Sequence, residues 1–180
     1  MSKDEVIFIF RDPLRCSGCR RCEIACSLHH EGRIWPEASR IRVFMLVPGV
    51  DIPHLCSQCD NYPCVSACPV EALSVDGGTG AVVVDREKCV GCGQCIKACP
   101  GNVPFLHPGD GKATICDLCG GSPECVKVCQ EAGFDALMLI RPKREPFFRK
   151  AFKRVFAQTP EELTRDVALN LFGEKAEELI

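Results

Sequence analysis

The chain has 180 residues, 46% of them hydrophobic, and a formal net charge of −2 when every thiol is counted as neutral. That length is enough for one compact domain or for two small modules. Sixteen residues are cysteine, a density that indicates a disulfide scaffold only in a secreted chain.

The first predicted element is a strand over Val6–Phe10. This apolar run is too short for the core of a signal peptide, and the acidic pair Asp4 and Glu5 precedes it. No stretch of the chain has the length of a membrane span. We therefore expect a cytoplasmic protein, in which thiols stay reduced and clustered cysteines bind metal.

Four groups of four cysteines come next and account for all sixteen. They are Cys16-x2-Cys19-x2-Cys22-x3-Cys26, Cys56-x2-Cys59-x4-Cys64-x3-Cys68, Cys89-x2-Cys92-x2-Cys95-x3-Cys99 and Cys116-x2-Cys119-x5-Cys125-x3-Cys129. The first three cysteines of a group lie on a tight loop, so their thiolates converge on one cube of iron and sulfide. The fourth lies about 6 Å further along a helix and, in two-cluster ferredoxins, ligates the neighbouring cube. Four such groups predict four [4Fe–4S] clusters.

A predicted hairpin decides which groups belong together. Two short apolar runs, 71–76 and 81–85, flank the glycine-rich turn Gly77–Gly80. The hairpin joins groups two and three into an inner module, so groups one and four form an outer one. Strands over Val6–Phe10 and Ala136–Ile140 flank the outer pair and are expected to pair with each other, and Ile41–Val47 is a further strand in the insertion between modules.

The predicted fold class is therefore α+β, with two nested modules like bacterial ferredoxins, short antiparallel strands and a helical C-terminal tail. The outer module spans 1–48 and 109–140, the inner module 49–108, and the tail 141–180. Four clusters with thiolate ligands bring the charge to roughly −10, which argues against a nucleic-acid partner.

Other interpretations of the cysteines are weaker. Structural zinc uses closed sets of four with a longer gap between the pairs, and disulfides need a secreted chain. An arrangement with one cluster lost or altered stays open. His29, His30, His54 and His107 lie near the groups, but all sixteen ligand places are filled by cysteine, so we expect them to pack or form hydrogen bonds.

The tail begins with a basic stretch in which Phe148, Phe152, Val155 and Phe156 recur at helical spacing. A second helix is expected to begin at Thr159, with Pro160 at its first position, and to continue through Ile180. The tail either folds back on this chain or docks on a partner subunit through those four residues. Contact with a membrane surface is a third alternative.

The motif Asp12-Pro13-x2-Cys16, the run from Ser39 to Val43 and Cys68-Pro69 resemble the four-cluster iron–sulfur subunits of molybdenum and tungsten oxidoreductases. The resemblance covers roughly residues 6–140. Subunits of the DMSO reductase type, of formate hydrogenlyase and of CO dehydrogenase share the pattern. The chain is most similar to the small subunits of tungsten aldehyde oxidoreductase and of tungsten-dependent benzoyl-CoA reductase.

The resemblance implies a crossed set of ligands. One outer cluster takes Cys16, Cys19, Cys22 and Cys129, and the other takes Cys26, Cys116, Cys119 and Cys125. One inner cluster takes Cys56, Cys59, Cys64 and Cys99, and the other takes Cys68, Cys89, Cys92 and Cys95.

We therefore expect a subunit without catalytic residues that relays electrons to or from a large catalytic subunit, of a tungsten or molybdenum pterin enzyme. A subunit of a hydrogenase or CO dehydrogenase is an alternative, as is a freestanding polyferredoxin. An enzyme with a labile cluster iron would need a group short of one cysteine, and none is short.

Overall fold

The computed structural model describes residues 7–141 and 157–179. In chain order the elements are β1 (Phe8–Arg11), α1 (Arg21–Glu31), η2 (Pro36–Ala38), β2 (Arg42–Val47), β3 (Val50–His54), α2 (Pro63–Ser66), β4 (Leu73–Val75), β5 (Val82–Val84), α3 (Gln94–Ala98), β6 (Phe105–Leu106), β7 (Ala113–Thr114), η3 (Leu118–Gly121), α4 (Glu124–Glu131), β8 (Leu137–Ile140), α6 (Pro160–Phe172) and η4 (Gly173–Glu178). In the described ranges the strands form two-stranded antiparallel sheets. The fold is thus a ferredoxin-like mixture of helices and short strands.

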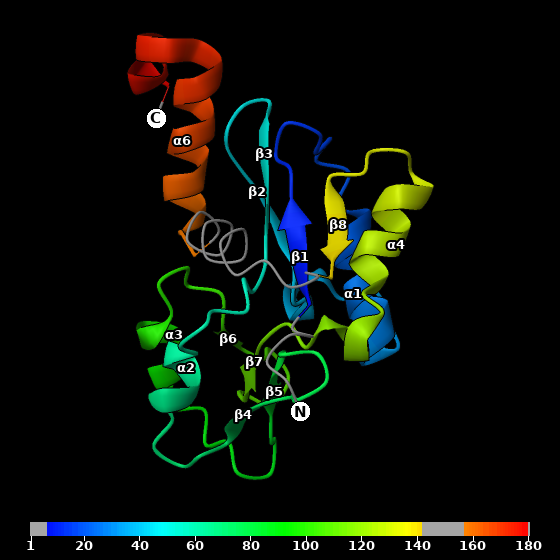
Figure 1. Ribbon diagram of the computed structural model, residues 1–180, viewed down its shortest axis with the longest axis vertical. Coiled ribbons are helices and arrows are strands. Elements are labelled where there is room, and N and C mark those ends of the chain that lie inside the picture. Colours follow the sequence, from blue (N-terminus) through cyan, green and yellow to red (C-terminus); the bar gives the residue numbers. More distant parts are fainter. Residues whose placement is uncertain (1–6, 142–156, 180) are drawn as a thin grey trace.

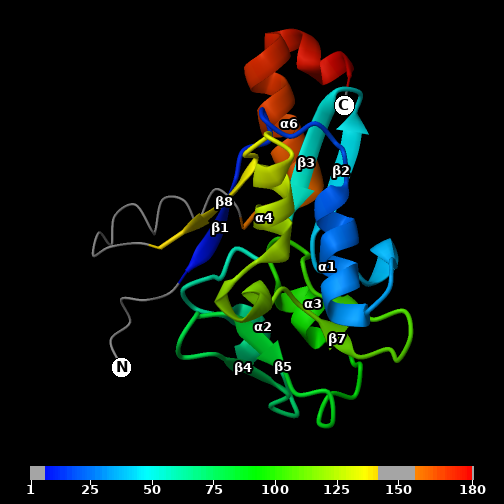
Figure 2. The ribbon, with the colours of Figure 1, turned by 90° about the vertical axis from the view of Figure 1, so that its right-hand side faces the viewer.

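The two ends of the cysteine-rich region meet in space. Strand β1 pairs with β8, with Phe8 opposite Ile140 and Arg11 opposite Leu137, and α1 packs against α4. Figures 1 and 2 show β1, β8, α1 and α4 side by side. The predicted pairing of the first and last strands is confirmed, and it brings cysteine groups one and four together.

The middle of the chain forms a second assembly at the lower end of both views. The predicted hairpin is confirmed as β4 and β5, with Leu73 opposite Val84, and α2 packs against α3. Strand β6 pairs with β7. That pairing joins residues on both sides of the boundary expected after residue 108.

The insertion forms a hairpin rather than one strand. The predicted strand is confirmed as β2, but it pairs with β3, which the sequence analysis missed. This pairing crosses the boundary expected after residue 48. Helix α6 lies along the hairpin in Figure 1, and Leu163 and Val167 pack on Val47, Val50 and Ile52. These residues form a small second core.

The start of α6 matches the sequence prediction. Thr159 Oγ1 accepts a hydrogen bond from the Glu162 N–H, and the Glu162 carboxylate accepts one from the Thr159 N–H, which makes a capping box. The α-helix ends at Phe172, and a 3-10 helix follows instead of the expected continuation through Ile180.

Part of the tail folds back on this chain, since helix α6 packs on the β2–β3 hairpin. Docking of the tail on a partner stays a prediction. The residues expected to contact that partner, Phe148, Phe152, Val155 and Phe156, lie outside the described ranges.

Candidate metal centres

The four cysteine loops share one backbone feature. The residue two positions after the first cysteine has a positive φ in every group: 67° at Gly18, 51° at Gln58, 69° at Gly91 and 58° at Leu118. The N–H groups of Gly18, Gln58 and Leu118 donate to the first thiol of their own loops. A left-handed φ costs a non-glycine residue roughly 1–2 kcal/mol. Gln58 and Leu118 adopt this conformation despite its cost, because it directs the backbone N–H of each residue at the sulfur atom of the first cysteine of its loop.

Other backbone amides also point at sulfur. Ala72 N lies 3.3 Å from Cys68 Sγ, Val103 N 3.5 Å from Cys99 Sγ, Ala113 N 3.3 Å from Cys89 Sγ and Arg40 N 3.2 Å from Cys26 Sγ. The first two donors stand four residues after the last cysteine of groups two and three, so the two groups are built alike. Amide hydrogen bonds to sulfur stabilise the thiolate form that metals require.

The thiols of group one gather with the last thiol of group four. The pKa of the Cys22 thiol is raised to about 12, mainly by burial and in smaller part by Glu23, Cys16 and Cys19. Burial also raises the pKa of the Cys16 thiol, to which Cys19 and Cys129 add. Cys129 is thus beside Cys16, at the far end of the cysteine-rich region.

The last thiol of group one gathers in turn with group four. Burial raises the pKa of the Cys125 thiol well above its usual value, and Cys116, Cys26 and Cys119 add to the rise. Burial raises the pKa of Cys119 to about 11, and Cys26 again contributes. The Cys129 thiol thus acts on group one, and the Cys26 thiol acts on group four.

An enclosed cavity marks the third set. Its lining includes the four thiols of Cys56, Cys59, Cys64 and Cys99, together with the Tyr62 ring and Ala157 from the tail. The pKa of the Cys56 thiol is raised to about 12, mainly by burial and in smaller part by the other three thiols. Groups two and three thus also share a site.

Of the fourth set, Cys68, Cys89, Cys92 and Cys95, three thiols lie close to one another. Burial raises the pKa of the Cys95 thiol, and Cys89 and Cys92 add to the rise. Cys68 accepts the amide hydrogen bond from Ala72, and its approach to the other three thiols stays a prediction.

These donors fit iron–sulfur clusters. All sixteen cysteines are free thiols, and buried thiols with a raised pKa need a cation beside them to be deprotonated at neutral pH. Four thiolates on a single zinc ion would lie about 3.8 Å apart, from a Zn–S bond of about 2.3 Å. Among the described residues, no three cysteines have sulfur atoms within 4.8 Å of one another. The quartets are therefore too wide for one ion and suit a larger cluster.

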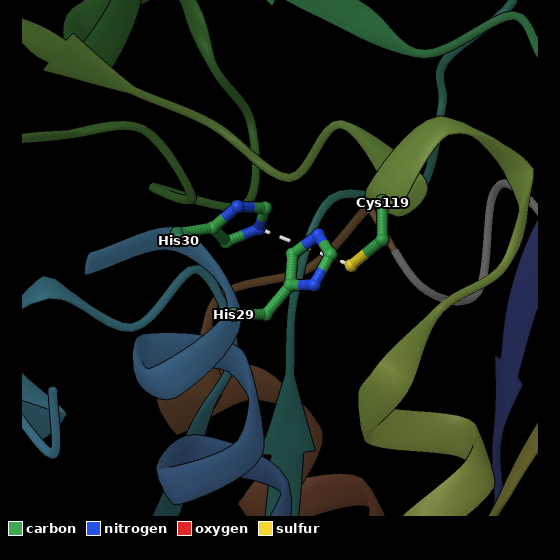
Figure 3. Close-up of side chains that lie close together, drawn as sticks. All are labelled: His29, His30 and Cys119. Atoms are coloured by element: carbon green, nitrogen blue, oxygen red, sulfur yellow. Dashed lines mark hydrogen bonds between the residues drawn. The ribbon is translucent and has the colours of Figure 1, made fainter. Parts of the chain in front are cut away.

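One close trio of possible ligand atoms does occur, at His29, His30 and Cys119 (Figure 3). His30 Nε2 lies 3.9 Å from Cys119 Sγ and 3.4 Å from a carboxylate oxygen of Asp117. Burial lowers the pKa of His30 to about 4, so its ring is neutral. A single ion here would compete with the cluster for Cys119, so we interpret His30 as a hydrogen-bond partner of that sulfur.

Sequence reasoning missed the buried and partly buried charged side chains around the thiols. Arg11, Glu23 and Arg40 are the main ones, and Arg11 is only 2% exposed. The sequence did contain a signal for the burial of Arg11, because Ile7, Ile9 and Arg11 alternate along the strand and share its buried face. An arginine on that face indicates a buried partner for its charge.

Comparisons with known proteins agree with this chemistry. Residues 49–136 match the family "4Fe-4S dicluster domain" and residues 13–28 match "4Fe-4S binding domain". The polyferredoxin-like subunit of the aliphatic sulfonate oxidoreductase of Pyrococcus furiosus is 56% identical over 94% of this chain and 95% of its own length. The thiosulfate reductase electron transfer subunit PhsB of Salmonella typhi is 37% identical over 67% of this chain and 70% of its own.

A solved structure, the active site complex BamBC of benzoyl coenzyme A reductase, contains a chain that is 25% identical to this one. The match covers 96% of this chain and 95% of that one, with a TM-score of 0.45. Of the helices in the described ranges, none has the length and apolar character needed to cross a bilayer.

Proposed function

The chain belongs to the family of iron–sulfur electron-transfer subunits of oxidoreductases, and we propose that it holds four [4Fe–4S] clusters in a row. When bound, such clusters accept and release single electrons. The residues of this chain contribute ligands, spacing and insulation. The relatives are themselves named as electron-transfer or polyferredoxin-like subunits, and the chain serves an oxidoreductase in the same way.

The observation that carries the proposal is that fourth cysteines act across groups: Cys129 affects the Cys16 thiol, Cys26 affects the thiols of Cys119 and Cys125, and Cys99 lines a cavity with Cys56. It supports four ligand sets: Cys16, Cys19, Cys22 and Cys129; Cys26, Cys116, Cys119 and Cys125; Cys56, Cys59, Cys64 and Cys99; and Cys68, Cys89, Cys92 and Cys95. We refer to these as the Cys16, Cys26, Cys56 and Cys68 sets. The first two form a proposed outer module and the last two an inner module, each like a bacterial ferredoxin.

Neighbouring sets are linked by single thiol pairs. Cys22 contributes to the raised pKa of Cys125 after burial and the thiols of its own set, which joins the Cys16 and Cys26 sets. Cys56 contributes in the same way to that of Cys116, which joins the Cys26 and Cys56 sets. These two links support the order Cys16, Cys26, Cys56, and the Cys68 set is placed last because it shares the proposed inner module with the Cys56 set. Cys19 and Cys92, one in each terminal set, are exposed, so electrons enter and leave at the two ends.

The catalytic partner is proposed from likeness alone. The sequence motifs support a tungsten or molybdenum pterin enzyme. The 56% identical relative belongs to an aliphatic sulfonate oxidoreductase, so a partner acting on sulfonates is the first to test. Copurification of the tagged chain under anaerobic conditions, with metal analysis of the complex, would identify it. A chain that elutes alone from extract would instead be a freestanding carrier.

Cluster content tests the core of the proposal. Anaerobically purified protein should hold about sixteen irons and about sixteen acid-labile sulfides per chain, from four cubes of four. Electron paramagnetic resonance of the reduced protein should show four interacting spins. About eight irons, or zinc in place of iron, would overturn the proposal.

A further inference from the structure

Two arginines, one buried and one partly buried, stand near the Cys26 set. The Arg11 guanidinium donates to the Leu55 carbonyl at 2.9 Å and to Ser57 Oγ at 2.8 Å. Burial lowers the pKa of Arg11 to about 10, while Cys56, Cys116 and Cys59 raise it, so the side chain is a cation at neutral pH. It thus lies where the Cys26 and Cys56 sets meet, with Cys56 as its strongest thiol partner and Cys116 as its partner in the Cys26 set.

Arg40 approaches the same set from the other side. Its backbone N–H donates to Cys26 Sγ, and its side chain is 18% exposed and pairs with Asp117 at 2.5 Å. Its Nε is buried with no hydrogen-bond partner in the structure. The positive charge lowers the pKa of the thiols of Cys26 and Cys119, against the larger opposing effect of their burial.

Two acidic side chains, Glu23 and Asp51, lie close to the Cys16 set, whereas arginines lie close to the Cys26 set. Glu23 is 5% exposed, and one of its carboxylate oxygens accepts a 2.6 Å hydrogen bond from Val43 N. The Asp51 carboxylate crowds the loop after Cys16, since its atoms lie 2.5–2.7 Å from where a Cβ on Gly18 would stand. Arg20 is the cation that faces Glu23, at 3.6 Å, and it is 56% exposed. Solvent screens that cation more than it screens the buried acid.

We propose that these fixed charges set the order of reduction potentials in the outer module, with the Cys26 cluster above the Cys16 cluster. The inference rests on the proposed ligand sets. An added electron is negative, so Arg11 and Arg40 stabilise it at the Cys26 set, whereas Glu23 and Asp51 oppose it at the Cys16 set. Near charges act strongly in a buried region of low dielectric constant. Asp117 offsets part of the Arg40 charge, and Arg11 remains as the surplus.

The order has a direct consequence for electron flow. An electron shared by the two outer clusters rests at the Cys26 set, on the side that faces Cys56 and the inner module. The charges thus hold the electron at the junction of the two modules.

Redox titration followed by electron paramagnetic resonance tests the order. Cys129→Ser and Cys26→Ser first assign each outer signal by removing it. Arg11→Gln and Arg40→Gln should then lower the Cys26 midpoint by at least a tenfold change in the reduction equilibrium, about 59 mV for one electron. Glu23→Gln, which keeps the acceptor for Val43 N, should raise the Cys16 midpoint. Arg165→Gln, on the exposed side of α6, is the matched control and should move neither.

Lysine variants separate charge from packing. Arg11→Lys and Arg40→Lys keep the cation, so both midpoints should stay near those of the wild type. The proposal would be overturned if the glutamine variants left both midpoint potentials unchanged. It would also be overturned if the Cys16 midpoint lay above the Cys26 midpoint in the wild type. If the glutamine variants no longer bound iron, the arginines would be needed for cluster assembly, and the proposal would be overturned as well. A wild type with fewer than four clusters would instead refute the ligand sets.

Discussion

Cys129 lies beside Cys16, although the two residues stand in the last and the first cysteine group. Burial is the main reason that the pKa of the Cys16 thiol is raised, and the Cys129 thiol adds to it. The neighbours of Cys129 in its own group, Cys119 and Cys125, gather with Cys26 instead.

We therefore expect Cys129→Ser to damage the cluster of the Cys16 set and to spare the other outer cluster. Electron paramagnetic resonance with iron analysis measures this directly. The control is Cys125→Ser, four positions earlier on the same helix, which should damage the Cys26 set. If both variants lost the same signal, the crossed ligand scheme would be wrong.

Gly91→Ala should reduce cluster content in the inner module. Gly91 has φ of 69°, and an added Cβ would stand 2.4 Å from the Gly111 carbonyl oxygen. The backbone strain alone costs about 1–2 kcal/mol, and the contact adds to it. Iron per chain and the thermal unfolding midpoint should both fall. Gly77→Ala is the control, since nothing lies within 4 Å of its added Cβ, and it should resemble the wild type.

Leu163→Ala should release α6 from the β2–β3 hairpin. Leu163 is 7% exposed in the small core with Val47, Val50 and Ile52. Removing a buried leucine costs about 2–5 kcal/mol of unfolding free energy. Limited proteolysis should cut the tail faster. Leu171→Ala on the same helix removes the same atoms from a side chain that is 50% exposed, and should change stability by no more than about 0.5 kcal/mol. Equal cleavage of the two variants would contradict the packing.

The phenylalanine-rich stretch remains the expected contact with a partner. Replacing Phe148, Phe152 and Phe156 together by serine should leave iron content unchanged and abolish copurification with the catalytic subunit. Burial of each such side chain contributes about 1.5–3 kcal/mol, enough in sum to decide whether a complex survives purification. Phe172→Ser, on α6 and 43% exposed, is the control. A complex that survives the triple substitution would place docking elsewhere.

The sequence predicted the parts of the fold that depend on local chemistry. Cysteine spacing indicated the four loops, the glycines at 77–80 indicated the β4–β5 turn, and Thr159 with Pro160 marked the start of α6. Strand β3 was missed because Pro53 interrupts a strand pattern and is tolerated only at a sheet edge. Strands β6 and β7 have two residues each, too few to show a period.

The charges around the thiols could not be predicted for a different reason. The position of Arg40 depends on its ion pair with Asp117, and burial of Glu23 depends on the Val43 amide. Such partners come together only once the chain has folded, so neither the spacing of residues nor the composition of the chain predicts these contacts. Ala157 is a similar case, since it lines the cavity of Cys56 from a tail distant in sequence.

The β1–β8 pairing imposes a sequence of events on biosynthesis. The β4–β5 hairpin, the helices α2 and α3 and all the inner cysteines have been made once the ribosome has passed Cys99, so the inner cysteines can gather early. Strand β1 is made first, yet it has no partner until β8 emerges. Until then its apolar face and the first four cysteines stay open, and closing so long a loop is slow. The ligands of the inner half are therefore all present in the chain before those of the outer half, which wait for Cys129.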